Sequence, residues 1–237
     1  MVRGFADLDG DVALVAEQRR LAGLRPPPWR PSPGPLVAVG AFVAFARGEQ
    51  GPGRAGDRAH VGAAATRDTS ELAHVVVRGV AGARYARGLL AAREGALLER
   101  AVRALLATGV TPDVLVVDAT GRDHPRRAGL ALHLGARLGL PSVGVTHRPL
   151  LAIGAEPPDR AGAWTALTRD GDVVGAWLRT QRGVRPVAVH AAWRTDVPVA
   201  VEVVQRVTAR ARTPEPLRRA RTWARTARAA AEGRTPG

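Results

Sequence analysis

The chain has 237 residues, a formal net charge of +14 at pH 7 and no cysteine. A chain of this length buries about 70–75% of its unfolded surface, so it needs no disulfide or metal to fold. The lack of cysteine excludes disulfide frameworks, thiolate nucleophiles and cysteine-based metal sites.

The excess of 35 basic over 21 acidic residues favours a polyanionic partner such as a nucleic acid. Every basic residue is arginine, which a GC-rich coding bias also explains, so a basic solvated surface is the alternative. No apolar run reaches the roughly 18 residues of a membrane span. The N-terminus lacks the basic and apolar regions of a signal peptide, and we therefore expect a cytoplasmic protein without a membrane partner.

The first third of the chain predicts a helix followed by three strands. Apolar residues at near-helical spacing predict a helix over 12–25, which three consecutive prolines end. Apolar runs over 36–45, 60–66 and 71–79 have strand length, and their short links predict an antiparallel meander. The glycine-rich stretch 47–58 predicts a turn or mobile loop between the first two strands.

Helices and strands then alternate. The patterns predict helices over 89–107, 124–138, 198–211 and 214–231, and strands over 113–120, 141–146, 172–180 and 185–193. Pro125 is expected in the first turn of its helix. A meander followed by such units predicts one mixed-sheet α/β domain over 36–232. We expect a helix and a proline-rich lead-in over 1–35, and a frayed tail over 233–237.

Asp118 is the sharpest candidate for chemistry. It ends a buried apolar strand, where a carboxylate is costly unless it is paired or binds a cation, and where ligands bind in open α/β sheets. Gly121 permits a tight turn after it. The following helix N-terminus, with Arg126 and Arg127, is suited to hold a phosphate. The alternative is that Asp118 only caps a turn.

Glu94 is the second candidate. Helical spacing places it on a largely apolar face with Leu90 and Leu98, where a carboxylate needs a partner. Two carboxylates from separate elements suit a phosphodiesterase that uses a divalent metal, because Mg²⁺ prefers oxygen ligands and activates water. The alternative is a solvated glutamate paired with a nearby arginine.

Seven segments resemble, in order, those of the endonuclease V family, repair nucleases that cleave near deaminated adenine. The most specific is PDVLVVDATGRDHPRRAGLALHLG, which is similar to the family's VDGHG and HPRR-x-G patterns. The others are EQRRLA (17–22), VAVGAFVAF (37–45), RYARGLLAARE (84–94), LPSVGVTHRPL (140–150), RPVAVHAAWRTDVPVAVEVVQRV (185–207) and RTPEPLRRA (212–220).

The resemblance implies an RNase H-like fold and a monomeric phosphodiesterase that acts near inosine in DNA or RNA. It makes Asp118 and Glu94 the catalytic and metal-binding carboxylates, with Mg²⁺ or Mn²⁺ as cofactor if the protein is active and no cofactor otherwise. Tyr85 matches the only retained residue of the family's wedge, where it would stack between bases. The other expected nucleic-acid contacts are Gly121, His124, Arg126, Arg127 and His147.

The sequence also departs from the family pattern. The family's first-strand Asp aligns with Phe42 and its Gly-His histidine with Trp193. A phenyl ring cannot bind Mg²⁺, and an indole N–H cannot act as a base. Ala119 replaces a glycine near the flipped base and is expected to narrow its pocket.

Two main hypotheses remain, besides an accidental resemblance of a basic α/β domain whose strands form another kind of sheet. The first is an active nuclease whose site is rebuilt around other ligands, for which the sequence offers Asp123, His190 and Asp196. The second is a catalytically inactive homologue that binds nucleic acid or a protein.

Overall fold

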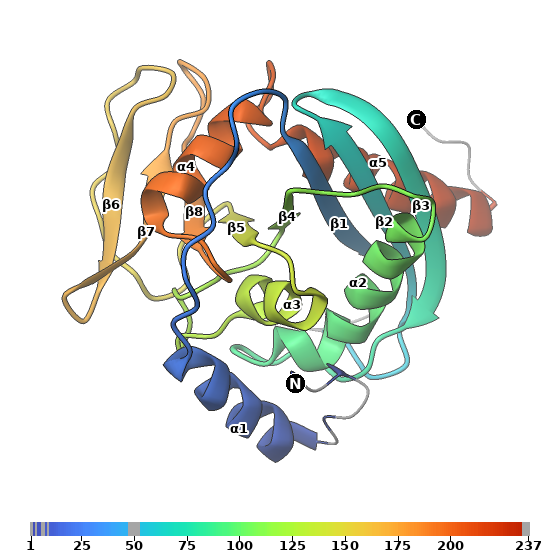
Figure 1. Ribbon diagram of the computed structural model, residues 1–237. Coiled ribbons are helices and arrows are strands. Elements are labelled where there is room, and N and C mark those ends of the chain that lie inside the picture. The colour runs from blue at the N-terminus through green and yellow to red at the C-terminus, as the bar shows by residue number, and fades with distance from the viewer. Residues whose placement is uncertain (1, 3, 6–7, 9, 47–52, 234–237) are drawn as a thin grey trace.

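The computed structural model describes residues 2, 4, 5, 8, 10–46 and 53–233. Residues 47–52 of the predicted loop and 234–237 of the predicted tail therefore lie outside the described residues, whereas residues 55–56 form a turn before β2 begins at Arg58. Eight strands of the described chain form one mixed sheet in the order β3-β2-β1-β4-β5-β8-β7-β6 (Figure 1). They are β1 (Val37–Phe45), β2 (Arg58–Arg67), β3 (Ser70–Val80), β4 (Val114–Val117), β5 (Ser142–Thr146), β6 (Trp164–Arg169), β7 (Asp172–Leu178) and β8 (Val187–Ala191).

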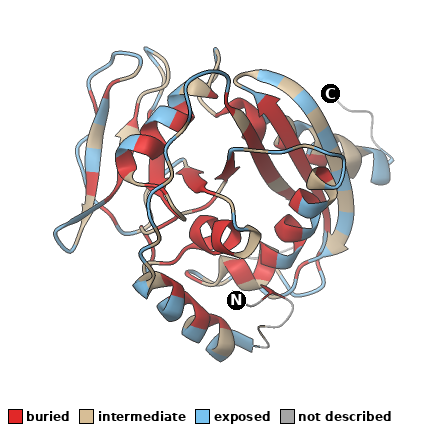
Figure 2. Ribbon diagram, viewed as in Figure 1, coloured by how far each residue is buried: buried red, intermediate tan, exposed pale blue. Residues whose placement is uncertain are grey.

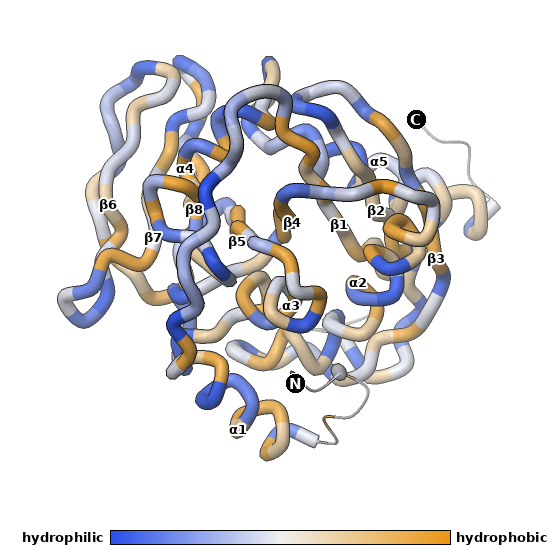
Figure 3. Tube along the Cα trace, in the orientation of Figure 1, coloured by the Kyte–Doolittle hydropathy of each residue, from blue (hydrophilic) through white to orange (hydrophobic). Residues whose placement is uncertain are grey.

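Helices cover both faces of this sheet. The described helices are α1 (Gly10–Gly23), α2 (Leu90–Leu106), α3 (Leu130–Leu138), α4 (Val197–Arg206) and α5 (Glu215–Ala231). One hydrophobic cluster joins the sheet to α1, α2 and α3, and a second joins the opposite face to α4 and α5. Because β4 is covered on both faces, all four of its residues are buried and apolar (Figures 2 and 3).

The predicted elements agree with this architecture, with three corrections, the first being that the helix predicted over 198–211 ends at Arg206. The antiparallel meander of β1, β2 and β3 and the mixed α/β class are confirmed. The helix predicted over 124–138 begins only at Leu130, because residues 124–129 form turns that tie the chain to neighbouring loops. Strand β6 was not predicted, because its sequence WTALTR has only one buried residue and lies at the sheet edge.

Parallel pairing of β1 and β4 determines which residues meet at the end of the sheet. The last pair in register is Ala41 with Val117. Phe42 and Asp118 are the next residues on the two strands, so they occupy adjacent positions. Alternation along β1 sends Val39, Ala41 and Val43 to the α2 side, and therefore Phe42 to the α5 side.

Two glycines bring α5 unusually close to this part of the sheet. A Cβ on Gly40 would lie 2.4 Å from the carbonyl carbon of Pro216, and a Cβ on Gly62 would lie 2.2 Å from the carbonyl oxygen of Ala220. The backbone of α5 thus rests directly on β1 and β2. Helical spacing then brings Arg221, the residue after Ala220, over the end of β1.

Among the described helices, none is long and apolar enough to cross a membrane.

Candidate nucleic-acid site

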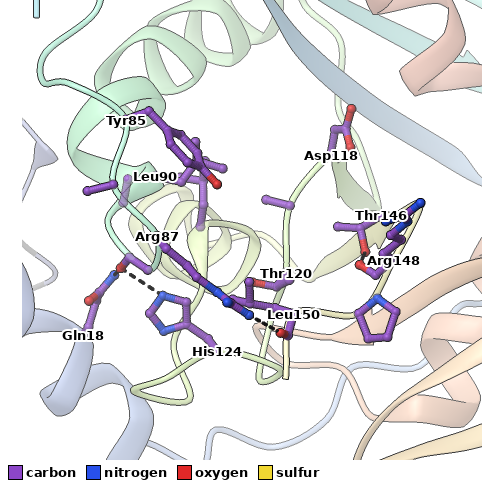
Figure 4. A pocket seen from close by; sticks show the side chains of 16 residues that line it. Gln18, Tyr85, Arg87, Leu90, Asp118, Thr120, His124, Thr146, Arg148 and Leu150 are labelled. Atoms are coloured by element: carbon purple, nitrogen blue, oxygen red, sulfur yellow. Dashed lines mark hydrogen bonds between the residues drawn. The ribbon is translucent and has the colours of Figure 1, made fainter. Parts of the chain in front are cut away.

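A pocket of about 320 Å³ opens beside Asp118. Its walls come from α1, from the segment that leads into α2, from the loop after β4 and from the loop after β5. Figure 4 shows Tyr85 and Asp118 on opposite sides of its upper part, with Thr120, His124 and Leu150 below them. Ala119 also lines the pocket, which remains open despite the extra methyl group expected to narrow it.

The carbonyl oxygen of Gly88 holds one wall of the pocket together. It accepts hydrogen bonds from Gln18 Nε2 at 3.3 Å, from His124 Nε2 at 3.0 Å and from an Arg126 Nη2 at 2.5 Å. His124 Nδ1 in turn accepts from the backbone N–H of Arg126 at 3.2 Å, so the ring carries its proton on Nε2. Burial lowers the pKa of His124 from 6.5 to about 4, and the ring is neutral at pH 7.

A second buried group holds the opposite wall. Asp123 is fully buried, and its carboxylate accepts backbone N–H bonds from Leu150 at 2.6 Å, Leu151 at 2.9 Å and Ala152 at 2.8 Å. These bonds tie the loop after β4 to the loop after β5. His190, also fully buried, lies 3.9 Å from the same carboxylate and bonds to Thr146 Oγ1 at 2.8 Å. Asp123 and His190 therefore act as structural groups, not as ligands beside Asp118.

Asp118 forms an ion pair with an arginine from α5. Arg221 Nη2 donates to Asp118 Oδ2 at 3.2 Å, and both side chains are partly exposed. The guanidinium carbon of Arg221 lies 5.0 Å from the centre of the Phe42 ring, and that of Arg225 lies 5.7 Å from it. Cation–π attraction and the ion pair together hold Arg221 at the end of β1 and β4.

Glu94 lies on α2, as predicted, and its carboxyl group is only partly ionised at pH 7. Burial raises the pKa of Glu94 from 4.5 to about 7, while Arg93 opposes that rise and the Asp118 charge adds to it. At pH 7 the carboxyl group is therefore close to half protonated. The charge of Asp118 contributes to this rise, so the Glu94 carboxyl group lies within electrostatic range of Asp118.

The residues at this site do not fit a divalent metal. Phe42 offers no donor beside Asp118, and the cation next to Asp118 is the guanidinium of Arg221. No cluster of three or more histidine or acidic side chains with the geometry to hold an ion is present in the described part of the chain. Mg²⁺ prefers several oxygen ligands in an octahedral arrangement, and Asp118 and Glu94 supply only two carboxyl groups.

Several predicted contacts have other roles. Arg126 also donates to Gln18 Oε1 at 2.5 Å, and Arg127 pairs with Asp170 at 3.0 Å, so both guanidinium groups are engaged within the protein. Because α3 starts after them, neither lies at a helix N-terminus as expected. Gly121 is buried, and a Cβ there would lie 2.1 Å from the carbonyl oxygen of Ala191, so packing alone requires glycine at this position.

The remaining predicted residues separate into two groups. Tyr85 lines the pocket and is 48% exposed, and the exposed His147 lies within electrostatic range of Asp118. Trp193 follows β8 next to Ser142, the first residue of β5, and packs against the α2–α3 cluster. It does not line the Asp118 pocket, and its alignment with the family's catalytic histidine stays a prediction. Asp196 caps α4 and pairs with Arg30.

Sequence reasoning missed Arg221, the residue that contacts Asp118. The matched segment RTPEPLRRA ends one residue before it, and nothing local marks an arginine in an arginine-rich helix. Arg87 and Arg148 were also missed. Both line the pocket, and Arg87 Nη2 donates to the carbonyl oxygen of Leu150 at 2.7 Å across its mouth (Figure 4).

Comparisons with known proteins agree with the resemblance found in the sequence. The family model described as Endonuclease V matches residues 37–222. A curated Endonuclease V from Nocardia farcinica is 46% identical over 151 residues, which are 63% of this chain and 64% of that protein. The chain thus matches just under two thirds of the length of this relative.

Solved structures share the fold. The crystal structure of Endonuclease V from Streptomyces avermitilis has a TM-score of 0.82 and 32% identity, over 98% of this chain and 99% of that one. Ciona intestinalis Endonuclease V, crystallised with a DNA that contains an inosine, has a TM-score of 0.76 and 19% identity, over 91% of this chain and 96% of that one. The expected RNase H-like fold is confirmed by these likenesses.

Proposed function

Because this chain belongs to the endonuclease V family, we propose that it binds single-stranded nucleic acid at the Asp118 pocket without metal-dependent cleavage. One observation carries the proposal: the guanidinium of Arg221 lies 3.2 Å from Asp118, over the ring of Phe42. A side-chain cation thus occupies the side of Asp118 where a metal would need a second carboxylate.

The pocket supports binding of an unstacked base. Leu90, Ala91 and Leu130 supply apolar wall, and Thr120 and the Asp118 carboxylate supply polar groups. Proteins that read a single base take it out of the stack into such a cavity and pack it against apolar or aromatic side chains. The exposed Tyr85 at the rim is suited to stack on a neighbouring base. The Ciona relative bound to inosine-containing DNA makes hypoxanthine the first base to test.

The charge around the pocket supports binding of the phosphate backbone. A guanidinium has five N–H donors, and Arg221 uses one of them on Asp118, which leaves others for a phosphate oxygen. Arg148 adds a second positive side chain at the rim. Under this proposal Arg221 supplies permanently the positive charge that a metal supplies in a nuclease.

The alternative function is metal-dependent cleavage near a deaminated adenine. It requires Glu94 to ionise fully and Arg221 to leave Asp118 when an ion binds. Neither Asp123 nor His190 lies where it would complete the ligand set, because both tie the pocket loops together.

The test compares binding and cleavage on the same strands. Single-stranded DNA and RNA with one inosine, and matched strands with adenosine, are incubated with the protein in Mg²⁺, in Mn²⁺ and in EDTA. We expect equal binding in all three conditions and no cleavage. Cleavage that needs the metal and disappears in Asp118→Ala would overturn the proposal.

A gain of metal binding tests the same idea in the opposite direction. The double variant Phe42→Asp/Arg221→Ala removes the ring and the guanidinium and adds a carboxylate beside Asp118. We expect it to bind Mn²⁺ at least tenfold more tightly than the natural chain in a calorimetric titration. The matched control carries Asp118→Ala in addition, and there the gain should vanish. Equal Mn²⁺ affinity of the natural chain and the double variant would contradict the metal-replacement argument.

A further inference from the structure

A second groove, of about 670 Å³, adjoins the Asp118 pocket. The two cavities share Arg148 and Pro149, so the groove begins at the rim of the pocket, on the side away from Tyr85 (Figure 4). A nucleic-acid strand that leaves the pocket past Arg148 therefore enters the groove next. None of the residues predicted from the sequence, apart from His147, lines it.

Positive charge dominates the walls of this groove. Three arginines line it, Arg148, Arg185 and Arg212, against a single carboxylate, that of Glu156. Glu156 lies 3.7 Å from Arg179, which reduces its ability to neutralise the groove. Arg148 and Arg185 are exposed, and no ion pair among the described residues engages either of them.

Two of these arginines, Arg185 and Arg212, lie close enough to repel each other. Burial lowers the pKa of Arg212, and the charge of Arg185 lowers it further. Arg212 Nη2 donates to the carbonyl oxygen of Pro186 at 2.7 Å, while its buried Nε has no hydrogen-bond partner. Like charges gathered in this way are relieved when an anion binds between them.

One aromatic ring is fixed in the same groove. Trp177 on β7 packs against the small cluster of Ala152, Leu167, Val174 and Ala188. Its indole N–H donates to the carbonyl oxygen of Gly154 at 3.2 Å, which sets the orientation of the ring. The side chain is half-buried and also lines the groove. A ring that is held in place loses little conformational entropy when a base stacks on it.

We propose that this groove is a second nucleotide subsite, in which a base stacks on Trp177 and the adjoining phosphate binds Arg185 and Arg212. A positively charged path with an aromatic platform is the arrangement by which proteins follow a single strand. The subsite rests on the proposed function, since its nucleotide belongs to the strand whose base enters the Asp118 pocket. It gives the strand its direction across the protein, from Tyr85 past Arg148 to Trp177.

The test varies the length of the nucleic-acid strand. Affinities in EDTA are measured by fluorescence anisotropy for a labelled trinucleotide with a central inosine and for a longer strand that reaches the groove. We expect the natural chain to bind the longer strand at least tenfold more tightly. Trp177→Leu keeps an apolar side chain on the cluster but removes the stacking surface, so it should lose most of this gain and leave trinucleotide binding unchanged.

Two further variants show whether the length effect comes from stacking on Trp177 and from the charge of Arg185, or from a general loss of stability. Trp164→Ala is the matched control, because Trp164 is an exposed tryptophan on the neighbouring strand β6 that does not line the groove. It should keep the full length effect. Arg185→Gln, at an exposed position, should reduce the length effect and flatten its salt dependence.

The outcomes distinguish the two proposals. A length effect that survives in both Trp177→Leu and Arg185→Gln overturns the second subsite but leaves binding at the Asp118 pocket intact. A natural chain that binds neither strand overturns the proposed function, and the subsite with it.

Discussion

The two sides of the Asp118 site are built differently. The pocket walls are held by buried groups: the Gly88 carbonyl accepts three side-chain bonds, and the Asp123 carboxylate accepts three backbone bonds. The edge at Phe42 is held by one partly exposed ion pair and a cation–π contact. Changing a buried network leaves polar groups without partners, whereas changing an exposed pair alters stability little.

This difference explains how residues at the Phe42 edge can be exchanged while the pocket walls keep their structure. The half-buried edge at Phe42 contains fewer buried hydrogen bonds than the walls, so exchanging its residues costs the fold less stability. The walls are part of the folded core, so the pocket persists as long as the protein folds. Four predictions test this contrast, in order of decreasing expected effect.

Asp123→Ala tests whether the fold holds the pocket walls. Three backbone N–H groups lose their acceptor, and we expect the free energy of unfolding to fall by about 4 kcal/mol. Urea denaturation measures it. Asp172→Ala removes an exposed carboxylate 3.4 Å from Arg127 and should change stability by less than about 0.5 kcal/mol. Similar losses in the two variants would remove the contrast.

His124→Gln tests whether the pocket wall keeps His124 neutral, and the measured quantity is the pH dependence of stability. The pKa of His124 is about 4 in the fold and 6.5 when unperturbed, so the unfolded state binds more protons between these values. Stability therefore falls as pH decreases from 6.5 to 4, and this group contributes roughly 3 kcal/mol to the fall. In the variant this part of the slope should disappear, whatever its stability at pH 8. An unchanged slope would show that the ring is not held neutral by the wall.

Glu94→Gln tests the raised pKa of Glu94 through the pH dependence of stability, which has the opposite sign to that of His124. The pKa of Glu94 is about 7 in the fold against 4.5, so the folded state binds the extra proton. The stability that this group contributes is present below pH 4.5 and is lost as pH rises through 7. We expect the variant to be about 3 kcal/mol more stable than the natural chain at pH 8, relative to their difference at pH 4.5. The absence of such a gain would show that the fold does not raise the pKa of Glu94.

Arg221→Ala tests the exposed edge by binding. Loss of one guanidinium from a phosphate should weaken nucleic-acid binding about tenfold and reduce the salt slope by about one phosphate contact, with little loss of stability. Anisotropy over a range of salt concentrations measures both effects. Arg218→Ala is the control, because Arg218 pairs with Glu215 at 2.8 Å on the same helix. Equal effects of the two variants would mean that only total charge matters.

Much of the fold was predictable because local patterns dominate it. The continuous apolar runs of β1, β4 and β5 and the helical spacing in α2 and α5 were sufficient to find these elements. The start of α3 was misplaced because the turns at 124–129 are held by Gly88, which is far away in sequence. Strand β6 was missed because an edge strand with mostly polar or exposed residues carries no periodic signal.

The candidate site was only half predictable. Asp118 and Glu94 were found because a carboxylate after a buried strand or on an apolar face is unusual in any sequence. Arg221 was not, because its contact depends on how closely α5 approaches β1 and β2 at Gly40 and Gly62. The alignment pairs Trp193 with the family's histidine, but only the fold shows that its side chain packs against the α2–α3 cluster and does not line the pocket.

The position of Arg221 on the chain has one last consequence. A bound ion is exchanged with the medium, so a chelator or a shortage of magnesium empties its site. The guanidinium is attached to α5 and lies at Asp118 at a fixed effective concentration, and no chelator can remove it. The charge at this site is therefore independent of the supply of divalent ions around the protein.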